Sequence, residues 1–387
     1  MKTNRRDFVK LTGAAGAGLI VTGLNSCAPV EGEVKFVDPV DGDMLTEYDG
    51  IVRDGILYKI VRITAPAGMH LKINGINARS GNGIYEAEVP LKDYRNVIEI
   101  TERRSGRKES IIVYRLRNYT NKYRLSLDDN ILFLKDISVN SSKYTSIFEN
   151  PYLCFLKKVH DTYGTKIHIN IYYQTEGFNL SDMTDKYREE WSRNSDWLRL
   201  SFHALQNEPD KPYLNAGYDQ VKKDCEIVMK QIRRFAGDEL LGPVTTLHWG
   251  EAKVEGCRAL RDSGYKALAG YFNLTDGKPV VSYYLDSEKA NHISNRSIWC
   301  DNIEGIIFKK IHLVINSYPL NEIIPLLDEV KKDNRKSAFI DLMIHEQYFY
   351  PSYSAYQPDF REKVMTAVKW ASDKGYKPSF LSDCIFS

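Results

Sequence analysis

The sequence carries no strong excess of charge and, beyond its first thirty residues, no long apolar run. Lys and Arg number 53 against 51 Asp and Glu, which gives a net charge of +2 at pH 7. Nucleic-acid binding usually shows as a concentrated basic patch, so nucleic acid is not expected as a partner. A membrane-spanning helix needs about 20 consecutive apolar residues. The missing apolar runs therefore exclude a span of this kind after the N-terminal segment.

Cysteine is also scarce, with six residues in a chain of 387. Leaving Cys27 aside, the others are scattered without paired spacing: Cys154, Cys225, Cys257, Cys300 and Cys384. This pattern argues against a disulfide framework and against a cysteine-based zinc site. Tyrosine, by contrast, is abundant, with 25 residues. Aromatic rings stack on sugars in proteins that handle glycans, but they also pack in cores, so this is a weak hint.

Residues 1–27 have the pattern of an export signal. The basic segment Asn4–Lys10 contains adjacent arginines of the twin-arginine type, and an uncharged stretch runs from Leu11 to Leu24. The stretch ends at Cys27 in a lipobox-like sequence, which predicts lipidation of that cysteine and stable membrane attachment. The alternative is an ordinary signal peptide with a chance cysteine. We expect an exported protein, anchored by lipid to the bacterial cell envelope on its periplasmic or surface side, with a tether at 28–33.

Residues 34–118 read as a small β-sandwich that serves as an accessory domain. Residues 57–63 alternate at period two for much of their length, and Asn74-Gly75 follows the alternating segment 70–73. An Asn-Gly pair between alternating segments is a strong hairpin signal. A second hairpin is predicted where residues 97–100 and 111–114 flank a turn at 105–108. The segment resembles immunoglobulin-like modules of envelope proteins, and a spacer role is favoured over sugar binding.

Residues 122–387 alternate between strands and amphipathic helices. Predicted strands at 124–127, 166–173 and 197–203 are separated by predicted helices at 151–163 and 181–193. The pattern continues with strands at 244–248, 266–271, 311–315, 338–345 and 379–381, and with helices at 218–235, 253–263, 321–332 and 359–374. Seven or eight such units predict a (β/α)7–8 barrel, closed or partly open, whose chemistry lies at the C-terminal ends of the strands.

Several polar residues stand where these predicted strands end. They are Asp128 and Asp129, His203, His248, and His345 with Glu346. The aspartate pair could simply cap a strand-end turn. Two adjacent carboxylates in a barrel mouth repel each other, however, and a cation or a bound proton relieves that repulsion. Carboxylate with imidazole suits zinc, with manganese, iron or cobalt as other possibilities.

The barrel segment resembles the polysaccharide deacetylase family, metal-dependent esterases that remove acetyl groups from envelope sugars. Its opening motif, an apolar strand ending in two aspartates, is matched by Leu125–Asp129, and its metal-binding histidine by His203. The resemblance implies that Asp128 is the general base and that Asp129 binds metal. The family expects a second histidine four residues after the first, where this chain has Asn207. The remaining ligand is therefore Asn207 or His248.

The later motifs are kept in part. The family's third motif aligns with Leu247–Gly250, but its arginine is absent. The closing motif is matched by Ile344-His345, followed by Gly375-Tyr376 and Phe380-Leu381. In the family this histidine is the general acid, and the resemblance carries that role to His345. The fold it implies is the barrel of the glycoside hydrolase and deacetylase type.

Three functions follow as hypotheses. The leading one is a metal-dependent hydrolase that removes acetyl groups from an envelope or dietary glycan, using the residues above. The second is a metal-free glycoside hydrolase, in which Asp128 or Asp129 pairs with Glu346 or Glu251. The third is a non-catalytic glycan-binding lipoprotein. Residues expected to contact the glycan are Trp249, Glu251, Glu346, Tyr348 and Tyr173, and the third hypothesis adds Tyr172 and Phe349.

Overall fold

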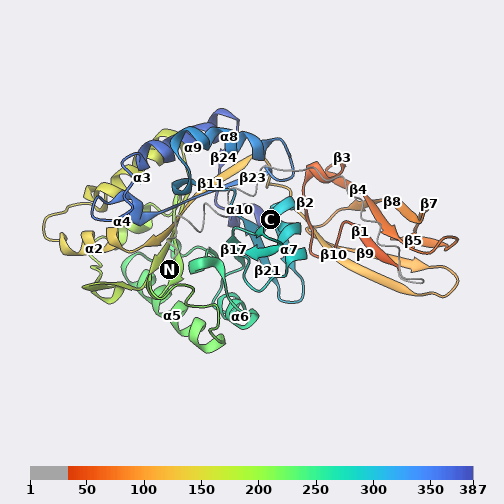
Figure 1. The fold of residues 1–387 in the computed structure, drawn as a ribbon, viewed down its shortest axis with the longest axis horizontal. Coiled ribbons are helices and arrows are strands. Elements are labelled where there is room, and N and C mark those ends of the chain that lie inside the picture. Colours follow the sequence, from red (N-terminus) through yellow and green to blue (C-terminus); the bar gives the residue numbers. More distant parts are fainter. Residues whose placement is uncertain (1–33, 387) are drawn as a thin grey trace.

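A computed structural model describes residues 34–386 of the chain. The predicted export signal, Cys27 and the tether at 28–33 lie outside the described residues, and the expected export and lipid anchor therefore stay predictions. Figure 1 shows two parts, an all-β part at one end and a larger part of strands and helices. None of the helices between residues 34 and 386 combines the length and the apolar character that a bilayer span requires.

The all-β part consists of two sheets that share one core. The first sheet contains β1 (Lys35–Asp38), β3 (Ile51–Arg53), β4 (Ile56–Thr64), β7 (Arg79–Gly81) and β8 (Ile84–Leu91). The second contains β2 (Met44–Leu45), β5 (Leu71–Ile73), β6 (Ile76–Asn77), β9 (Arg95–Glu102) and β10 (Lys108–Arg115). Inward side chains from both sheets, such as Val61 and Ile100, pack in the same cluster. A two-sheet sandwich forms because alternate residues of each strand are apolar.

Both predicted hairpins are present in this part. β5 and β6 pair antiparallel across Asn74-Gly75, whose φ angles of 46° and 80° are the positive values that a tight two-residue turn requires. β9 and β10 pair antiparallel, with Thr101 opposite Lys108. The predicted likeness to immunoglobulin-like modules stays a prediction.

The larger part is built on a six-stranded parallel sheet. Its order is β15 (Leu198–Ala204), β12 (Ile167–Tyr172), β11 (Lys122–Asn130), β23 (Phe339–His345) and β22 (Leu313–Val314), with β24 (Lys377–Pro378) also paired to β11. Every residue of β12 and β23 is buried. This is expected for a parallel sheet that is covered on both faces.

A second sheet contains β16 (Val244–Thr245), β17 (Ala267–Gly270), β20 (Ile298–Asp301) and β21 (Ile306–Lys310), of which only β20 runs antiparallel to its neighbour. The two sheets approach each other at a parallel bridge between Leu200 and Leu241. The chain is thus mixed α/β here, and closure of the sheets into a barrel stays a prediction. Two short hairpins lie outside these sheets: β13 (Gln174–Thr175) with β14 (Phe178–Asn179), and β18 (Asn273–Thr275) with β19 (Lys278–Val280).

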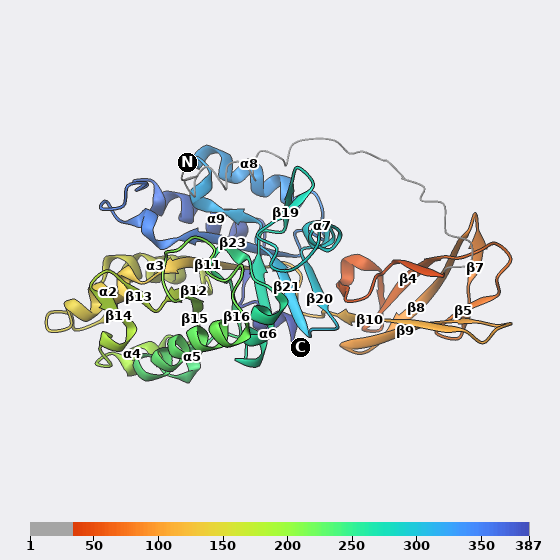
Figure 2. The same cartoon turned by 60° about the horizontal axis from the view of Figure 1, so that its bottom comes forward.

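Helices flank these sheets (Figure 2). They are α2 (Leu132–Val139), α3 (Pro151–Tyr163), α4 (Arg188–Arg193), α5 (Tyr218–Phe235), α6 (Val254–Asp262), α7 (Ser287–Arg296), α8 (Leu320–Lys331), α9 (Phe360–Asp373) and α10 (Ser382–Ile385). α3 has the predicted bounds because Asn150 caps its N-terminus and Gly164, with φ 66°, ends it. Two expectations are corrected in their bounds. The helix at 181–193 is confined to α4, and the last strand, expected near 379–381, lies at β24, two residues earlier. The segment 277–308 contains α7 and β20.

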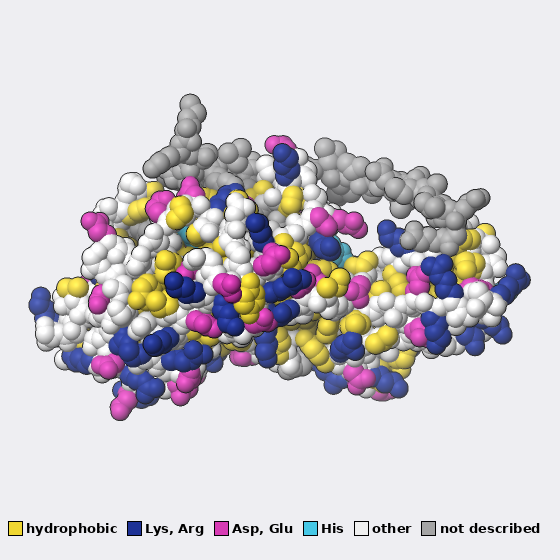
Figure 3. All heavy atoms as spheres, turned by 90° about the horizontal axis from the view of Figure 1, so that it is seen from below, with side chains coloured by type: hydrophobic (Ala, Val, Ile, Leu, Met, Phe, Trp, Pro, Cys, Tyr) yellow, Lys and Arg dark blue, Asp and Glu magenta, His cyan; other side chains and the backbone are white. Residues whose placement is uncertain are grey.

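The two parts of the chain are joined through buried charges. Asp43, which is 1% exposed, lies 2.6 Å from His292 and 3.2 Å from Arg296 of α7. Arg296 also lies 2.7 Å from Asp49. These contacts fix the sandwich against α7. On the face drawn in Figure 3, basic and acidic side chains intermingle, as the small net charge leads one to expect.

Candidate metal centre

The adjacent aspartates lie at the C-terminal end of β11, in an irregular stretch of the strand. Pairing with β12 shifts register between Leu127 and Asn130, and Asp129 has a positive φ of 63°. An extra residue in a strand breaks the alternation of side chains between the two faces, and such bulges are common beside active sites. Both carboxylates are buried, with 2% exposure for Asp128 and 4% for Asp129. The local strain is of the kind that a folded chain retains at functional positions.

Two histidines from neighbouring elements meet Asp129. His203 is the last residue but one of β15, and His248 begins a short 3-10 turn, His248–Gly250, just beyond β16. The Oδ1 atom of Asp129 lies 3.0 Å from Nε2 of His203 and 3.2 Å from Nδ1 of His248. The two imidazole nitrogens are 3.2 Å apart. All three donor atoms lie within 4.8 Å of one another, and all three residues are buried.

The remaining nitrogens of the two imidazoles are held by backbone carbonyls. Nδ1 of His203 contacts the carbonyl oxygen of Thr246, and Nε2 of His248 lies 2.9 Å from that of Asn207. A carbonyl only accepts, so both of these nitrogens carry the proton and donate it. The nitrogens that face Asp129 are then acceptors. Outer contacts of this kind are typical of histidines that bind metals, because they fix the tautomer and the orientation of the ring.

Asp129 is oriented by two further side chains. The hydroxyl of Tyr172 donates to Oδ1, and Nε2 of Gln347 donates to Oδ2 at 2.7 Å. Tyr172 is the last residue of β12, and Gln347 follows β23. Apart from the Tyr172 hydroxyl, the centre brings together one carboxylate oxygen and two imidazole lone pairs. The electron pairs of these three atoms repel one another unless a cation or an additional proton lies between them. The chemistry of these donors therefore fits a divalent metal, zinc in particular.

Asp128 and His345 form a second pair beside this centre. They are register partners on adjacent parallel strands, β11 and β23, so their Cα atoms are neighbours across the ladder. Nδ2 of Asn170 donates to Oδ1 of Asp128 at 2.6 Å. Nδ1 of His345 lies 2.9 Å from Oδ1 of Asn316, which directs the other ring nitrogen away from that contact. The predicted base and acid thus lie side by side, each held by an asparagine.

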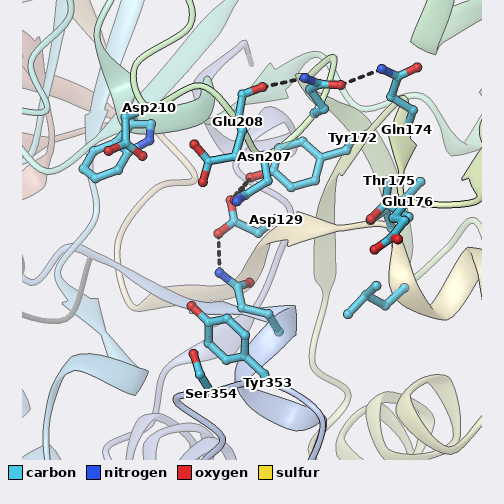
Figure 4. Close-up of a pocket in the computed structure, with 15 residues that line it drawn as sticks. Asp129, Tyr172, Gln174, Thr175, Glu176, Asn207, Glu208, Asp210, Tyr353 and Ser354 are labelled. Carbon is cyan, nitrogen blue, oxygen red and sulfur yellow. Dashed lines mark hydrogen bonds between the residues drawn. The ribbon is translucent and has the colours of Figure 1, made fainter. Parts of the chain in front are cut away.

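A cavity of about 910 Å³ opens next to Asp129, which is within the range of small-molecule sites. Figure 4 shows Asp129 near its centre, with Tyr172, Asn207 and Glu208 on one side and Tyr353 on the other. The residues that line it are Asp129, Ile131, Leu132, Tyr172, Gln174, Thr175, Glu176, Gln206, Asn207, Glu208, Asp210, Trp249, Gln347, Tyr353 and Ser354. Amide and carboxylate groups beside aromatic rings suit a ligand rich in hydroxyls.

The predicted glycan-contacting residues have different positions. Trp249 lines the cavity, and its contact with a glycan stays a prediction. Glu251 pairs with Lys211 at 3.0 Å, Tyr173 is half-buried, and neither belongs to the lining. Tyr348 is 1% exposed and packs against the rings of His345 and Tyr353, so its predicted contact with the glycan is corrected to a packing role.

Glu346 is also corrected, because it is fully buried and caps a helix. Its carboxylate accepts hydrogen bonds from the backbone N–H groups of Ile131, Leu132 and Phe133 at 2.6–2.9 Å, at the start of α2. Burial raises the pKa of Glu346 to about 7, against the opposing effect of these backbone hydrogen bonds. The residue supports the segment that follows the aspartate pair and does not face the cavity.

Replacing Glu346 with Ala should destabilise the fold by about 3 kcal/mol, because several buried backbone N–H groups lose their acceptor. Urea unfolding measures this change, and the Glu346→Gln variant, which keeps one carbonyl oxygen, should lose less. Unfolding free energies for Glu346→Ala within about 0.5 kcal/mol of wild type would contradict the capping role.

Sequence reasoning missed most of the cavity lining. Gln347 could have been suspected because it follows His345-Glu346 at a strand end, while Glu176, Gln206, Glu208 and Asp210 lie in connections that carry no periodic signal. Asn207 was proposed as a ligand through its side chain. In the structure its backbone carbonyl holds His248, and its side-chain oxygen lies 3.2 Å from the Tyr172 hydroxyl.

No protein-family model matches the sequence, and no curated protein matches it. Solved structures similar to the chain include 4-alpha-glucanotransferase from Thermococcus litoralis, at 11% identity and TM-score 0.46 over 69% of this chain. This chain spans 40% of that enzyme. A presumed polysaccharide deacetylase from Mycobacterium smegmatis is 10% identical over 69% of this chain and 90% of its own, with TM-score 0.39. The carbohydrate deacetylase Agd3 is 9% identical over 90% of this chain and 67% of its own, with TM-score 0.38. These likenesses are too distant to assign the chain to a family.

Proposed function

We propose that this protein is a metal-dependent hydrolase that removes acetyl groups from an envelope or dietary glycan. The observation that supports this most directly is the convergence of Asp129, His203 and His248 in one buried cluster, of which Asp129 also lines the cavity. Two imidazoles and one carboxylate with room for water are a common donor set of catalytic zinc sites. A divalent metal bound there would polarise the acyl carbonyl and lower the pKa of a water molecule.

The residues of the chain supply the other parts of the reaction. In the proposed reaction, Asp128, which accepts a hydrogen bond from Asn170, would take a proton from the attacking water. His345, whose Nδ1 contacts Asn316, would give one to the departing amine or alkoxide. Gln347 and Tyr172 keep the Asp129 carboxylate in position. Trp249 and Tyr353 offer ring surfaces to a sugar at the cavity wall. The acetyl group itself is implied by the resemblance of the strand-end motifs.

The alternative, a metal-free glycoside hydrolase, lacks the second catalytic carboxylate that the sequence predicts for it. It requires Glu346 or Glu251 as the second carboxylate, but Glu346 is occupied by three backbone N–H groups and Glu251 by Lys211. A protonated or free carboxyl group facing the cavity is what such a mechanism needs. The cavity lining contains three other carboxylates besides Asp129, namely Glu176, Glu208 and Asp210.

The test is acetate release from a panel of N- and O-acetylated oligosaccharides by purified protein. We expect acetate release that stops after treatment with a chelator and returns when zinc is added back, because the proposed chemistry depends on the metal. New reducing ends measured in the same reactions monitor glycosidic cleavage. Reducing ends that form in the presence of the chelator, without acetate, would replace this proposal with the glycoside hydrolase.

A further inference from the structure

The cavity is acidic although the chain as a whole is not. Its lining contains four carboxylate residues, Asp129, Glu176, Glu208 and Asp210, and among the lining residues there is no Lys, Arg or His. The whole chain, by comparison, has a net charge of +2. Negative charge is therefore concentrated in the cavity next to the candidate metal centre.

Three of these carboxylates are not used by the metal centre. Within residues 34–386, the side chains of Glu176, Glu208 and Asp210 form no ion pair closer than 4.0 Å and no side-chain hydrogen bond. Two nearby lysines are engaged with other groups. Nζ of Lys135 donates to the backbone carbonyl of Glu176, and Nζ of Lys211 lies 3.0 Å from Glu251. In Figure 4, Glu208 and Glu176 lie on opposite sides of Asp129.

A separate observation also points to a ligand in this cavity. Gln347 belongs to the lining, and its amide nitrogen is bound to Asp129. Its other amide atom, Oε1, is buried and accepts no hydrogen bond from the described residues. A buried acceptor without a donor is costly, and such an atom in a native protein calls for a water, an ion or a functional partner. An N–H or O–H group of a ligand in the cavity would supply the missing donor.

The physical consequence is selection by charge. Uncompensated carboxylates around a concave surface focus a negative potential, which attracts cations and repels anions. A glycan with uronate or sulfate groups enters this cavity at a cost, whereas an ammonium group gains. Glycans with positive charge are amino-sugar polymers from which some acetyl groups have been removed.

We propose that the cavity selects amino-sugar glycans that already carry free ammonium groups beside the acetylated unit. This rests on the proposed deacetylation. In that reaction the amide C–N bond breaks, water supplies the hydroxyl to the acyl carbon and a proton to nitrogen, and the products are acetate and an amine that takes up a further proton. Each turnover therefore adds one positive charge to the glycan. Glu176, Glu208 and Asp210 bind that charge, so that earlier products improve later binding.

The experiment compares oligosaccharides that differ only in charge. Hexamers of N-acetylglucosamine and of N-acetylgalactosamine, fully acetylated or half deacetylated, are titrated calorimetrically against the full protein, with a glucuronate-containing hexamer as the anionic member. The half-deacetylated hexamer of at least one series should bind about tenfold more tightly than its neutral parent at low salt. This preference should shrink to about twofold at 0.5 M salt, because screening weakens exposed charge pairs.

Two triple variants distinguish the effect of the cavity carboxylates from the effect of carboxylates elsewhere on the surface. The triple variant Glu176→Gln, Glu208→Gln, Asp210→Asn should lose the preference and still bind the neutral hexamer. The control Glu189→Gln, Glu255→Gln, Glu322→Gln removes the same number of exposed carboxylates outside the cavity lining and should keep it. Equal binding of neutral and cationic hexamers in both series, or a preference that survives in the first triple variant, overturns the inference. The inference is also overturned if wild-type protein binds a second equivalent of metal that the first triple variant does not bind. The three carboxylates would then form a second metal site.

The outcomes distinguish this inference from the proposed function. If the protein binds zinc and releases acetate equally from neutral and cationic hexamers, the proposed hydrolase activity stands and the charge selection is rejected. If it binds cationic hexamers preferentially but neither binds metal nor releases acetate, the charge selection stands and the proposed hydrolase activity is rejected.

Discussion

Replacing His203 with Ala is expected to remove bound metal from the protein and, with it, the hydrolytic activity. Nε2 of His203 lies 3.0 Å from Oδ1 of Asp129, in a buried cluster whose third member is His248. Loss of outer contacts alone lowers metal affinity by about 10–100-fold, so loss of one of three donors should exceed about 100-fold. Metal analysis of purified wild type and variant measures this directly. About one equivalent of zinc is expected in the first, and almost none in the second.

Two further variants make the result specific. His248→Ala should behave as His203→Ala does, whereas His70→Ala removes an exposed histidine of the sandwich and should leave the metal content unchanged. A metal-free wild-type protein, after refolding in the presence of zinc, manganese, iron or cobalt, would reject the centre altogether. Zinc that is retained fully in both His203→Ala and His248→Ala would place it elsewhere.

Asn207→Ala separates two interpretations of the same position. If the side chain is a ligand, as the motif resemblance suggests, the variant should lose metal to a similar extent. In the structure the contact to Nε2 of His248 is made by the backbone carbonyl, which the substitution keeps. We therefore expect Asn207→Ala to retain most of its zinc, with at most about a tenfold loss of affinity.

The sequence predicts that the members of the candidate centre lie together, but it does not predict their surroundings. Asp129, His203 and His248 are predicted to be neighbours because parallel strands end at one edge of a sheet and each residue lies at the end of a predicted strand. The structure brings the three side chains into one cluster. The bounds of α3 and α5 were predictable for a similar reason, since apolar residues recur at helical spacing. Periodicity and caps are local properties, and they specify elements and their ends.

Contacts between distant segments leave no such signal. Glu346 looked like a carboxylate at the rim, yet it caps α2 through backbone groups more than 200 positions earlier in the chain. The same holds for Gln347, which reaches back to Asp129. The bulge at Asp128 and Asp129 depends on pairing with β12, and the acidic lining comes from connections without regular structure. These features follow from tertiary packing, which overrides local preference.

Replacing Asp128 with Asn should lower kcat by about 1000-fold while the protein keeps its metal. A positioned general base contributes typically about 10²–10⁴-fold to a reaction of this kind. Asp128 is the register partner of His345 and accepts a hydrogen bond from Asn170 at 2.6 Å, so its carboxylate is fixed beside the candidate acid. An amide of nearly the same shape keeps the packing but cannot take up the proton of the attacking water.

The readout must exclude a merely structural effect. Zinc content and the unfolding free energy of Asp128→Asn should stay close to wild type, so that the loss falls on kcat with little change in KM. Asn170→Ala, which removes the 2.6 Å contact but leaves the carboxylate, should reduce kcat by only about tenfold. If Asp128→Asn keeps kcat within about tenfold of wild type with zinc bound, the base is another group. The unpaired carboxylates of the cavity wall, Glu208 first among them, would then be the residues to replace.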